Sequence, residues 1–158
     1  MVTVGIVGVL AAVATISVSR SEYGQSVKAY AEQIAAVCDL ARERAVATRR
    51  WQHLEITATE LTHWQVATEG MGQPDEWRMI QRLDVPRDIT VVAADNRALI
   101  TTGRSDPLPG AGLPAEIDFG PDGSGTAATV FISDPHNARH SRVIVYRATG
   151  TAYVLDSW

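Results

Sequence analysis

The chain starts with nineteen uncharged residues, Met1 to Ser19. This segment is apolar all round, whereas a helix buried in a soluble core usually keeps a polar stripe. Nineteen helical residues at about 1.5 Å each span roughly the hydrocarbon core of a bilayer. The pattern therefore predicts a membrane-spanning helix half over residues 1–19.

A cleaved signal peptide is the alternative for this segment, because Ala12-Val13-Ala14 resembles a small-residue cleavage site. A signal peptide also has a basic region before its apolar stretch. Here the first basic residue is Arg20, which follows the apolar stretch. The order of charges thus favours the membrane helix.

Four small residues, Gly5, Gly8, Ala11 and Ala12, fall on nearby turns of this helix. In lipid, close packing drives helix association, and small side chains let two backbones approach. Glycine is also generally common in membrane helices, which is the competing explanation. We expect these four residues to form a helix-packing face.

The helical period continues beyond the polarity change at Arg20, and no proline occurs before Pro74. Apolar or small residues recur every three or four positions, which predicts one buried stripe. These are Val27, Tyr30, Ala31, Ile34, Val37, Cys38, Ala41 and Ala45. We interpret residues 20–50 as the amphipathic half of the same helix, with Cys38 as a small core residue and not a nucleophile.

After Arg50 the period of apolar positions changes to two. Eight short runs rich in β-branched and aromatic residues are separated by turn residues, which predicts eight strands. The runs are 53–56, 61–66, 77–83, 89–93, 117–119, 129–133, 142–146 and 152–155. Gly150 is available for a positive φ in the hairpin that joins the last two.

The amphipathic half of the helix needs a cover, and one face of an antiparallel sheet is the simplest one. The sequence therefore predicts an α+β fold, in which a long N-terminal helix packs on an antiparallel β-rich head over residues 51–158. The chain of 158 residues, 46% of them hydrophobic, is long enough to bury a real core.

Charge limits the possible partners. The chain carries a net charge of −4, and residues 51–158 hold eight arginines against fourteen acidic residues. Counterion release by a broad basic surface is therefore excluded as a route to nucleic acid. Arg139, Arg142 and Arg147, near His140, form the one plausible basic patch, and scattered surface charge is the interpretation we favour.

Motifs for catalysis or metal binding are weak. The segment 120–125 is glycine-rich but lacks the Lys-Ser/Thr of a phosphate-binding loop, so it predicts a β-turn. His136 and His140 have ligand spacing only in a helix, and Pro135 indicates a loop. The spacing of the aspartates Asp118, Asp122 and Asp134 matches no calcium loop. We expect no catalytic residue, metal site or cofactor, and therefore no enzyme.

Several motifs resemble those of type IV pilins and type II secretion pseudopilins. The start MVTVGIVGVLAAVA is similar to the part of their N-terminal signature that follows Gly-Phe-Thr-Leu-Ile-Glu-Leu. Ala41-Arg42-Glu43-Arg44-Ala45 resembles the Ala-Arg-x-x-Ala segment of the H-type pseudopilins, the GspH/FimT group. Phe119-Gly120-Pro121-Asp122-Gly123 and the later Gly150 resemble that group's Phe-x-Pro-x-Gly turn and closing hairpin.

The resemblance implies a pilin-like fold and a non-enzymatic minor pseudopilin or minor pilin. Such a subunit helps to initiate or cap the filament of a type II secretion pseudopilus or type IV pilus. It implies other pilins or pseudopilins as partners through the N-terminal helix, and inner-membrane lipid before assembly. The protein would cross the bacterial inner membrane once, with its head in the periplasm or in an extracytoplasmic filament.

A DNA-binding minor pilin that acts in DNA uptake for natural transformation is the alternative, because some relatives in this group capture DNA through a basic C-terminal region. Residues 154–158 contain no basic residue. Since phosphate contacts dominate DNA affinity, we do not expect nucleic acid as a partner.

Met1 enters the family signature part-way through, so either the true start lies upstream of Met1 or the chain lacks the family's standard processing. We expect the in-frame codons just upstream to encode the Gly-Phe-Thr-Leu-Ile-Glu-Leu segment, preceded by a basic leader that would set the orientation of the helix. The glutamate of that segment, which neutralises a neighbouring subunit's terminus in the family, has no counterpart among residues 1–158.

Overall fold

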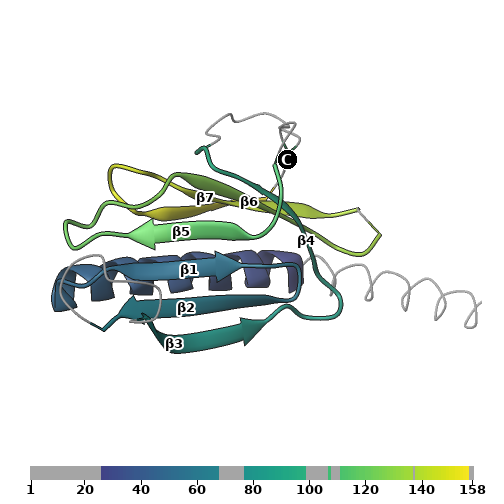
Figure 1. Ribbon diagram of the computed structural model, residues 1–158. Coiled ribbons are helices and arrows are strands. Elements are labelled where there is room, and N and C mark those ends of the chain that lie inside the picture. Colours follow the sequence, from purple (N-terminus) through teal and green to yellow (C-terminus); the bar gives the residue numbers. More distant parts are fainter. Residues whose placement is uncertain (1–25, 68–76, 99–106, 108–110, 137, 157–158) are drawn as a thin grey trace, which may run out of the picture.

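The computed structural model describes residues 26–67, 77–98, 107, 111–136 and 138–156 (Figure 1). Within these ranges the chain forms one helix, followed by eight strands. The membrane-spanning half predicted for residues 1–19 lies outside the described residues, as do the first residues of the amphipathic half. The helical residues that the structure describes do not include a segment with the length and hydropathy of a membrane span.

The described helix covers residues 26–48. It ends there because Arg49 has a φ of 54°, in the left-handed region that commonly terminates helices. In the last turn the hydroxyl of Thr48 donates a hydrogen bond of 2.7 Å to the carbonyl oxygen of Arg44. This bond satisfies one of the carbonyl groups that a helix C-terminus otherwise leaves without a partner.

The first sheet has four antiparallel strands in the order β3-β2-β1-β5. They are β1 (Gln52–Ile56), β2 (Glu60–Val66), β3 (Trp77–Asp84) and β5 (Ala115–Phe119). In β1 the side chains of Leu54 and Ile56 are fully buried, and those of His53 and Glu55 lie half-buried on the opposite face. This alternation gives the sheet an inner face toward the helix and an outer face away from it.

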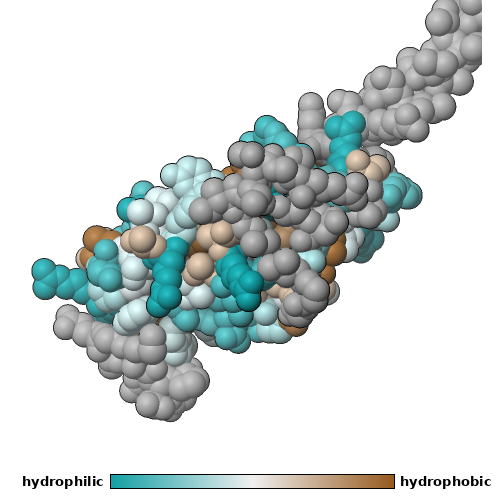
Figure 2. Space-filling model, turned by 90° about the horizontal axis from the view of Figure 1, so that it is seen from above, coloured by the Kyte–Doolittle hydropathy of each residue, from teal (hydrophilic) through white to brown (hydrophobic). Residues whose placement is uncertain are grey.

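The second sheet, also antiparallel, has the order β4-β6-β7-β8. Its strands are β4 (Thr90–Asp95), β6 (Ala128–Ser133), β7 (His140–Val145) and β8 (Ala152–Leu155). All six residues of β6 and the last five of β7 are buried, so both faces of these central strands are covered. Seen from above, the described surface is mostly hydrophilic or intermediate, with hydrophobic residues in small separate spots (Figure 2).

The helix and both sheets share one hydrophobic core. This core includes Ile34 and Cys38 of the helix, Leu54 and Ile117 of the first sheet, and Val130 and Val143 of the second. In Figure 1 the helix runs behind β1 and β2. A hydrogen bond joins the helix to each sheet: Gln65 Nε2 of β2 donates to Thr48 Oγ1 at 3.3 Å, and the backbone N–H of Ala152 in β8 donates to Asp39 Oδ1 at 3.5 Å.

The expected α+β class, with the helix on antiparallel strands, is confirmed, and each of the eight predicted runs overlaps a strand. One difference concerns the sheets, because the structure has two where the sequence suggested one. The consecutive strands β4 and β5 belong to different sheets, and strand patterns alone do not determine such a partner change. Another difference is local, since β7 begins at His140, two residues before the predicted run.

Candidate functional site

The helix is the element whose two faces have different surroundings. All eight residues of the predicted stripe are buried, with exposed fractions of 5% or less, which confirms the stripe. Burial of its larger aliphatic side chains, such as Val27 and Ile34, stabilises the fold by about 1.5–3 kcal/mol each. This face therefore holds the helix against the head.

The opposite face of the helix is open to contact. Leu40 and Val46 are 45% and 48% exposed, although both side chains are apolar. The exposed Glu43 lies between them, and the exposed residues Ala36 and Glu32 precede Leu40 on the same side of the helix by about one and two turns. A strip of apolar and small residues flanked by carboxylates is suited to packing against another protein chain.

The family-like motifs meet where the helix ends. Gly150, with φ 58°, and Gly123, with φ 81°, lie in two adjacent turns, and a Cβ added to Gly150 would approach the carbonyl oxygen of Gly123 to 2.6 Å. The same added atom would lie 3.1 Å from Arg42 Cδ and 3.3 Å from Phe119 Cδ1. The three motifs therefore form one tightly packed corner, and the positive φ expected for Gly150 is confirmed.

The glycine-rich segment forms a turn, as predicted. The backbone N–H of Gly123 donates to the carbonyl oxygen of Gly120 at 2.9 Å. Asp122 Oδ1 accepts hydrogen bonds from the backbone N–H and the hydroxyl of Ser124, at 3.0 and 2.6 Å. These bonds lower the pKa of Asp122, because they favour the ionised carboxylate. The carboxylate thus stabilises its own turn.

The other aspartates considered for metal binding are engaged elsewhere. Asp118 Oδ1 lies 2.7 Å from His53 Nδ1, and Asp134 Oδ1 accepts a hydrogen bond of 2.8 Å from the backbone N–H of Ala138. Among the described residues, no group of three or more His, Cys, Asp or Glu side chains is arranged to hold a metal ion. Pro135 and His136 are exposed and lie outside the strands.

Cys38 is fully buried in the helix–sheet core. Burial raises the pKa of its thiol to about 12, with a smaller contribution from Asp39. A thiol that stays protonated at neutral pH is a poor nucleophile. The expectation of a small core residue is confirmed.

The three arginines of the possible basic patch do not come together. Arg142 of β7 is buried, at only 1% exposed, so it is not available to a surface ligand. Arg139 and Arg147 are exposed at opposite ends of β7, and eight residues of extended chain span roughly 26 Å. This corrects the idea of one basic patch and supports scattered charge.

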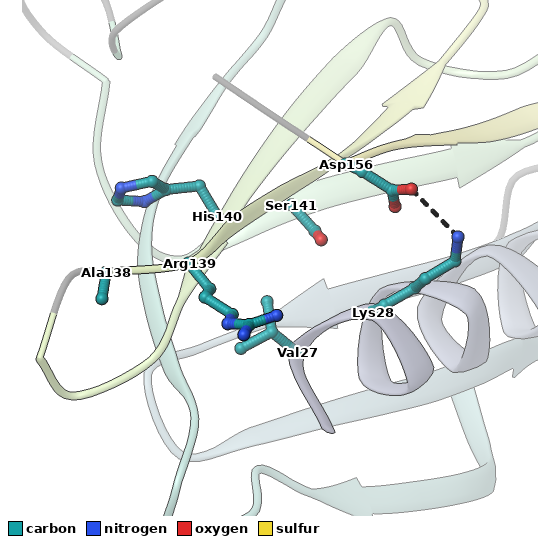
Figure 3. A pocket seen from close by; sticks show the side chains of 7 residues that line it. All are labelled: Val27, Lys28, Ala138, Arg139, His140, Ser141 and Asp156. Atoms are coloured by element: carbon teal, nitrogen blue, oxygen red, sulfur yellow. Dashed lines mark hydrogen bonds and ion pairs between the residues drawn. The ribbon is translucent and has the colours of Figure 1, made fainter. Parts of the chain in front are cut away.

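Arg139 and Arg147 line two different pockets. Arg139 lies beside a pocket of about 590 Å³ between the start of the described helix and the start of β7 (Figure 3). In it Lys28 Nζ pairs with Asp156 Oδ2 at 2.9 Å, so this cation already has an acidic partner. Arg147 lines a second pocket with Trp51 and Asp118. The residues Gly5, Gly8, Ala11 and Ala12, expected to pack against another helix, lie outside the described residues.

Sequence reasoning missed two polar features. His63 and Gln52 are fully buried on the inner face of the first sheet, where His63 Nε2 donates to Gln52 Oε1 at 2.9 Å. On the outer face, His53, Trp64 and Trp77 line a pocket. A signal for this pocket was present in the sequence, because Trp64 and Trp77 are large aromatic residues at strand positions that face away from the core.

The family model described as "Type II transport protein GspH" matches residues 30–150. Two structures of the minor pseudopilin EpsH from the type II secretion system of Vibrio cholerae are similar in fold. One has a TM-score of 0.59 at 16% identity, covering 83% of this chain and 97% of EpsH. The other has a TM-score of 0.60 at 15% identity, covering 85% and 96%. No curated protein sequence matches the chain. Because the family model spans most of the chain, including the helix, the corner motifs and nearly all strands, this protein belongs to the GspH family of type II transport proteins.

Proposed function

We propose that this protein is a minor pseudopilin, a non-enzymatic structural subunit that helps to initiate or cap the pseudopilus of a type II secretion system. The observation that carries the proposal is the two-faced helix within a GspH-family chain. One face of the helix is buried against the head, and the other presents Leu40 and Val46 at the surface. A filament subunit needs both a fixed head and a helix face left over for its neighbours.

The N-terminal residues have a part in the same proposal. Residues 1–19 hold the subunit in the inner membrane before assembly, with the head on the periplasmic side. Gly5, Gly8, Ala11 and Ala12 provide a small-residue face on which helices of other pilins or pseudopilins pack. A type IV pilus is the closely related alternative assembly in which such a subunit would act.

A gene deletion tests the proposed function. Cells without the protein should lose export of type II substrates into the medium, because an unprimed or uncapped filament does not operate. The wild-type gene should restore export, whereas a gene lacking codons 1–19 should not. Normal export with loss of pili in the deletion strain would move the subunit to pilus machinery. Normal export and normal pili together would contradict the proposal.

DNA uptake is the competing function, and its prediction differs. With Arg142 buried and with Arg139 and Arg147 at opposite ends of β7, few cations can neutralise neighbouring phosphates. We expect a gel shift to show weak or absent binding of duplex DNA at physiological salt. Micromolar binding that is lost in an Arg139→Gln, Arg147→Gln variant would favour DNA uptake, and both substitutions are at exposed positions that preserve the core.

A further inference from the structure

The outer face of the first sheet carries an aromatic pocket with acidic walls. The pocket has a volume of about 430 Å³ and is lined by His53, Glu55, Trp64, Trp77 and Glu116. These residues come from β1, β2, β3 and β5, so the pocket crosses the whole sheet. His53 and Glu55 lie on the face of β1 opposite to the buried Leu54 and Ile56, so the pocket is on the side of the sheet away from the helix. The helix runs behind β1 and β2 in Figure 1.

The aromatic side chains are held in place. The indole Nε1–H of Trp64 donates a hydrogen bond of 3.1 Å to Thr62 Oγ1. The rings of His53 and Trp77 meet edge to face, with centroids 5.4 Å apart. Next to Trp64 on the neighbouring strand, Met79 is 45% exposed. Fixed, partly exposed tryptophans offer π-faces at a low entropic cost.

The two glutamates of the pocket lie close enough to repel each other. Glu55 and Glu116 are direct partners across β1 and β5. Like charges directly opposite each other on paired strands destabilise a sheet. Within the described residues, neither carboxylate forms an ion pair. A cation bound between them would relieve this repulsion.

The carboxylates around the pocket already favour a positive charge there, as the pKa of His53 shows. Asp118 accepts a hydrogen bond from His53 and raises the pKa of that ring against the opposing effect of partial burial. Glu116 and Glu55 add to the increase. The His53–Asp118 pair balances its own charge when the ring is protonated, which leaves Glu55 and Glu116 uncompensated.

We infer that this pocket binds an arginine side chain presented by a partner protein other than a second copy of this chain. A guanidinium group is flat, so it stacks on tryptophan, and its forked N–H donors match carboxylates. A lysine ammonium fits the charge but not the stacking. The inference does not depend on the proposed filament role, since the pocket lies on the outer sheet face and uses neither the helix nor residues 1–19.

Fluorine NMR on the full chain, labelled with 5-fluorotryptophan and held in nonionic detergent, tests the inference. The four tryptophans give four signals, which single Trp→Phe variants assign. The probes are the peptide acetyl-Gly-Arg-Gly-amide and its citrulline equivalent, which has the same shape without the charge. The arginine peptide should shift the Trp64 and Trp77 signals saturably and bind at least about fivefold more tightly than the citrulline peptide.

Matched variants separate the carboxylates from general charge. A Glu55→Gln, Glu116→Gln variant should weaken arginine-peptide binding at least about fivefold, and its unshifted Trp51 signal would show that the fold is kept. A Glu32→Gln, Glu43→Gln variant makes the same change in net charge on the exposed helix face and should bind as the wild type does.

Three results would overturn the inference. Equal affinity for the citrulline peptide would indicate apolar binding alone. Undiminished binding by the Glu55→Gln, Glu116→Gln variant would remove the carboxylates from the site. Signals of Trp64 and Trp77 that change with protein concentration in the absence of peptide would assign the pocket to self-association.

Discussion

At the scale of single residues, the buried polar side chains are the main departure from the sequence pattern. His63 is fully buried on β2, and among the described residues its Nδ1 has no hydrogen-bond partner. Arg142 of β7 is also buried, with only 1% of its surface exposed. The alternation of apolar and polar residues along a strand indicates which residues share a face. It does not reveal that both faces of β7 are covered, so arginine was expected at the surface.

His63 gives the first residue-scale prediction, a dependence of stability on pH. Burial, helped by the nearby Arg44 charge, lowers its pKa to about 4 from an ordinary value of 6.5. Above pH 6.5 the ring is neutral in both the folded and the unfolded chain, so stability is highest. As the pH falls from 6.5 toward 4, the unfolded chain binds a proton that the folded chain cannot, and stability decreases.

Thermal unfolding of the wild type and of His63→Gln, followed by circular dichroism at pH 7 and pH 4.5, measures this effect. The melting temperature of the wild type should fall by at least about 3 °C more than that of the variant. The comparison isolates His63, because His53 and the carboxylates titrate in both proteins. A His136→Gln control, changed at an exposed position, should follow the wild type. Equal decreases in wild type and His63→Gln would show that the buried ring is not responsible.

At the scale of elements, the helix stripe and the eight strands could be predicted because each depends on local periodicity. The eight stripe residues recur at helical spacing, and the strands are short β-branched runs between turn residues. The pairing of strands could not be predicted from local patterns. β4 and β5 are consecutive in sequence, but β4 pairs with β6 in one sheet and β5 pairs with β1 in the other. The acidic pocket was missed for the same reason, since Glu55 and Glu116 become neighbours only through the pairing of β1 with β5.

The corner between the helix end and the two glycine turns gives the element-scale prediction. In Gly150→Ala the new Cβ would overlap a backbone oxygen, that of Gly123, in a conformation with positive φ. We expect the free energy of unfolding to fall by roughly 2–4 kcal/mol. Gly112→Ala is the matched control, because nothing lies within 4 Å of its added Cβ, and it should stay within about 0.5 kcal/mol of wild type. Urea denaturation of both variants measures the difference, and equal stability would mean that the corner is loosely packed.

At the scale of the whole molecule, three parts of the fold differ in their surroundings, and we assign each a different role. The inner faces of both sheets and one side of the helix form the core. The free side of the helix is the surface we assign to assembly, and the outer face of the first sheet is the surface we assign to an arginine-bearing partner. The family assignment was already indicated by the sequence, since its motifs are short contiguous segments, whereas the arrangement of these three parts depends on contacts between distant segments.

The most direct measurement of the assembly claim is photo-crosslinking in the native cell. A benzophenone amino acid replaces Leu40, 45% exposed on the free helix face, or, as a control, Val92, 41% exposed on β4. With the chain at its native level, we predict that irradiation at position 40 yields covalent adducts with other pilin-like subunits and that position 92 yields far fewer. The account would be contradicted if position 40 gave no such adducts in a folded chain, or if positions 40 and 92 gave them equally.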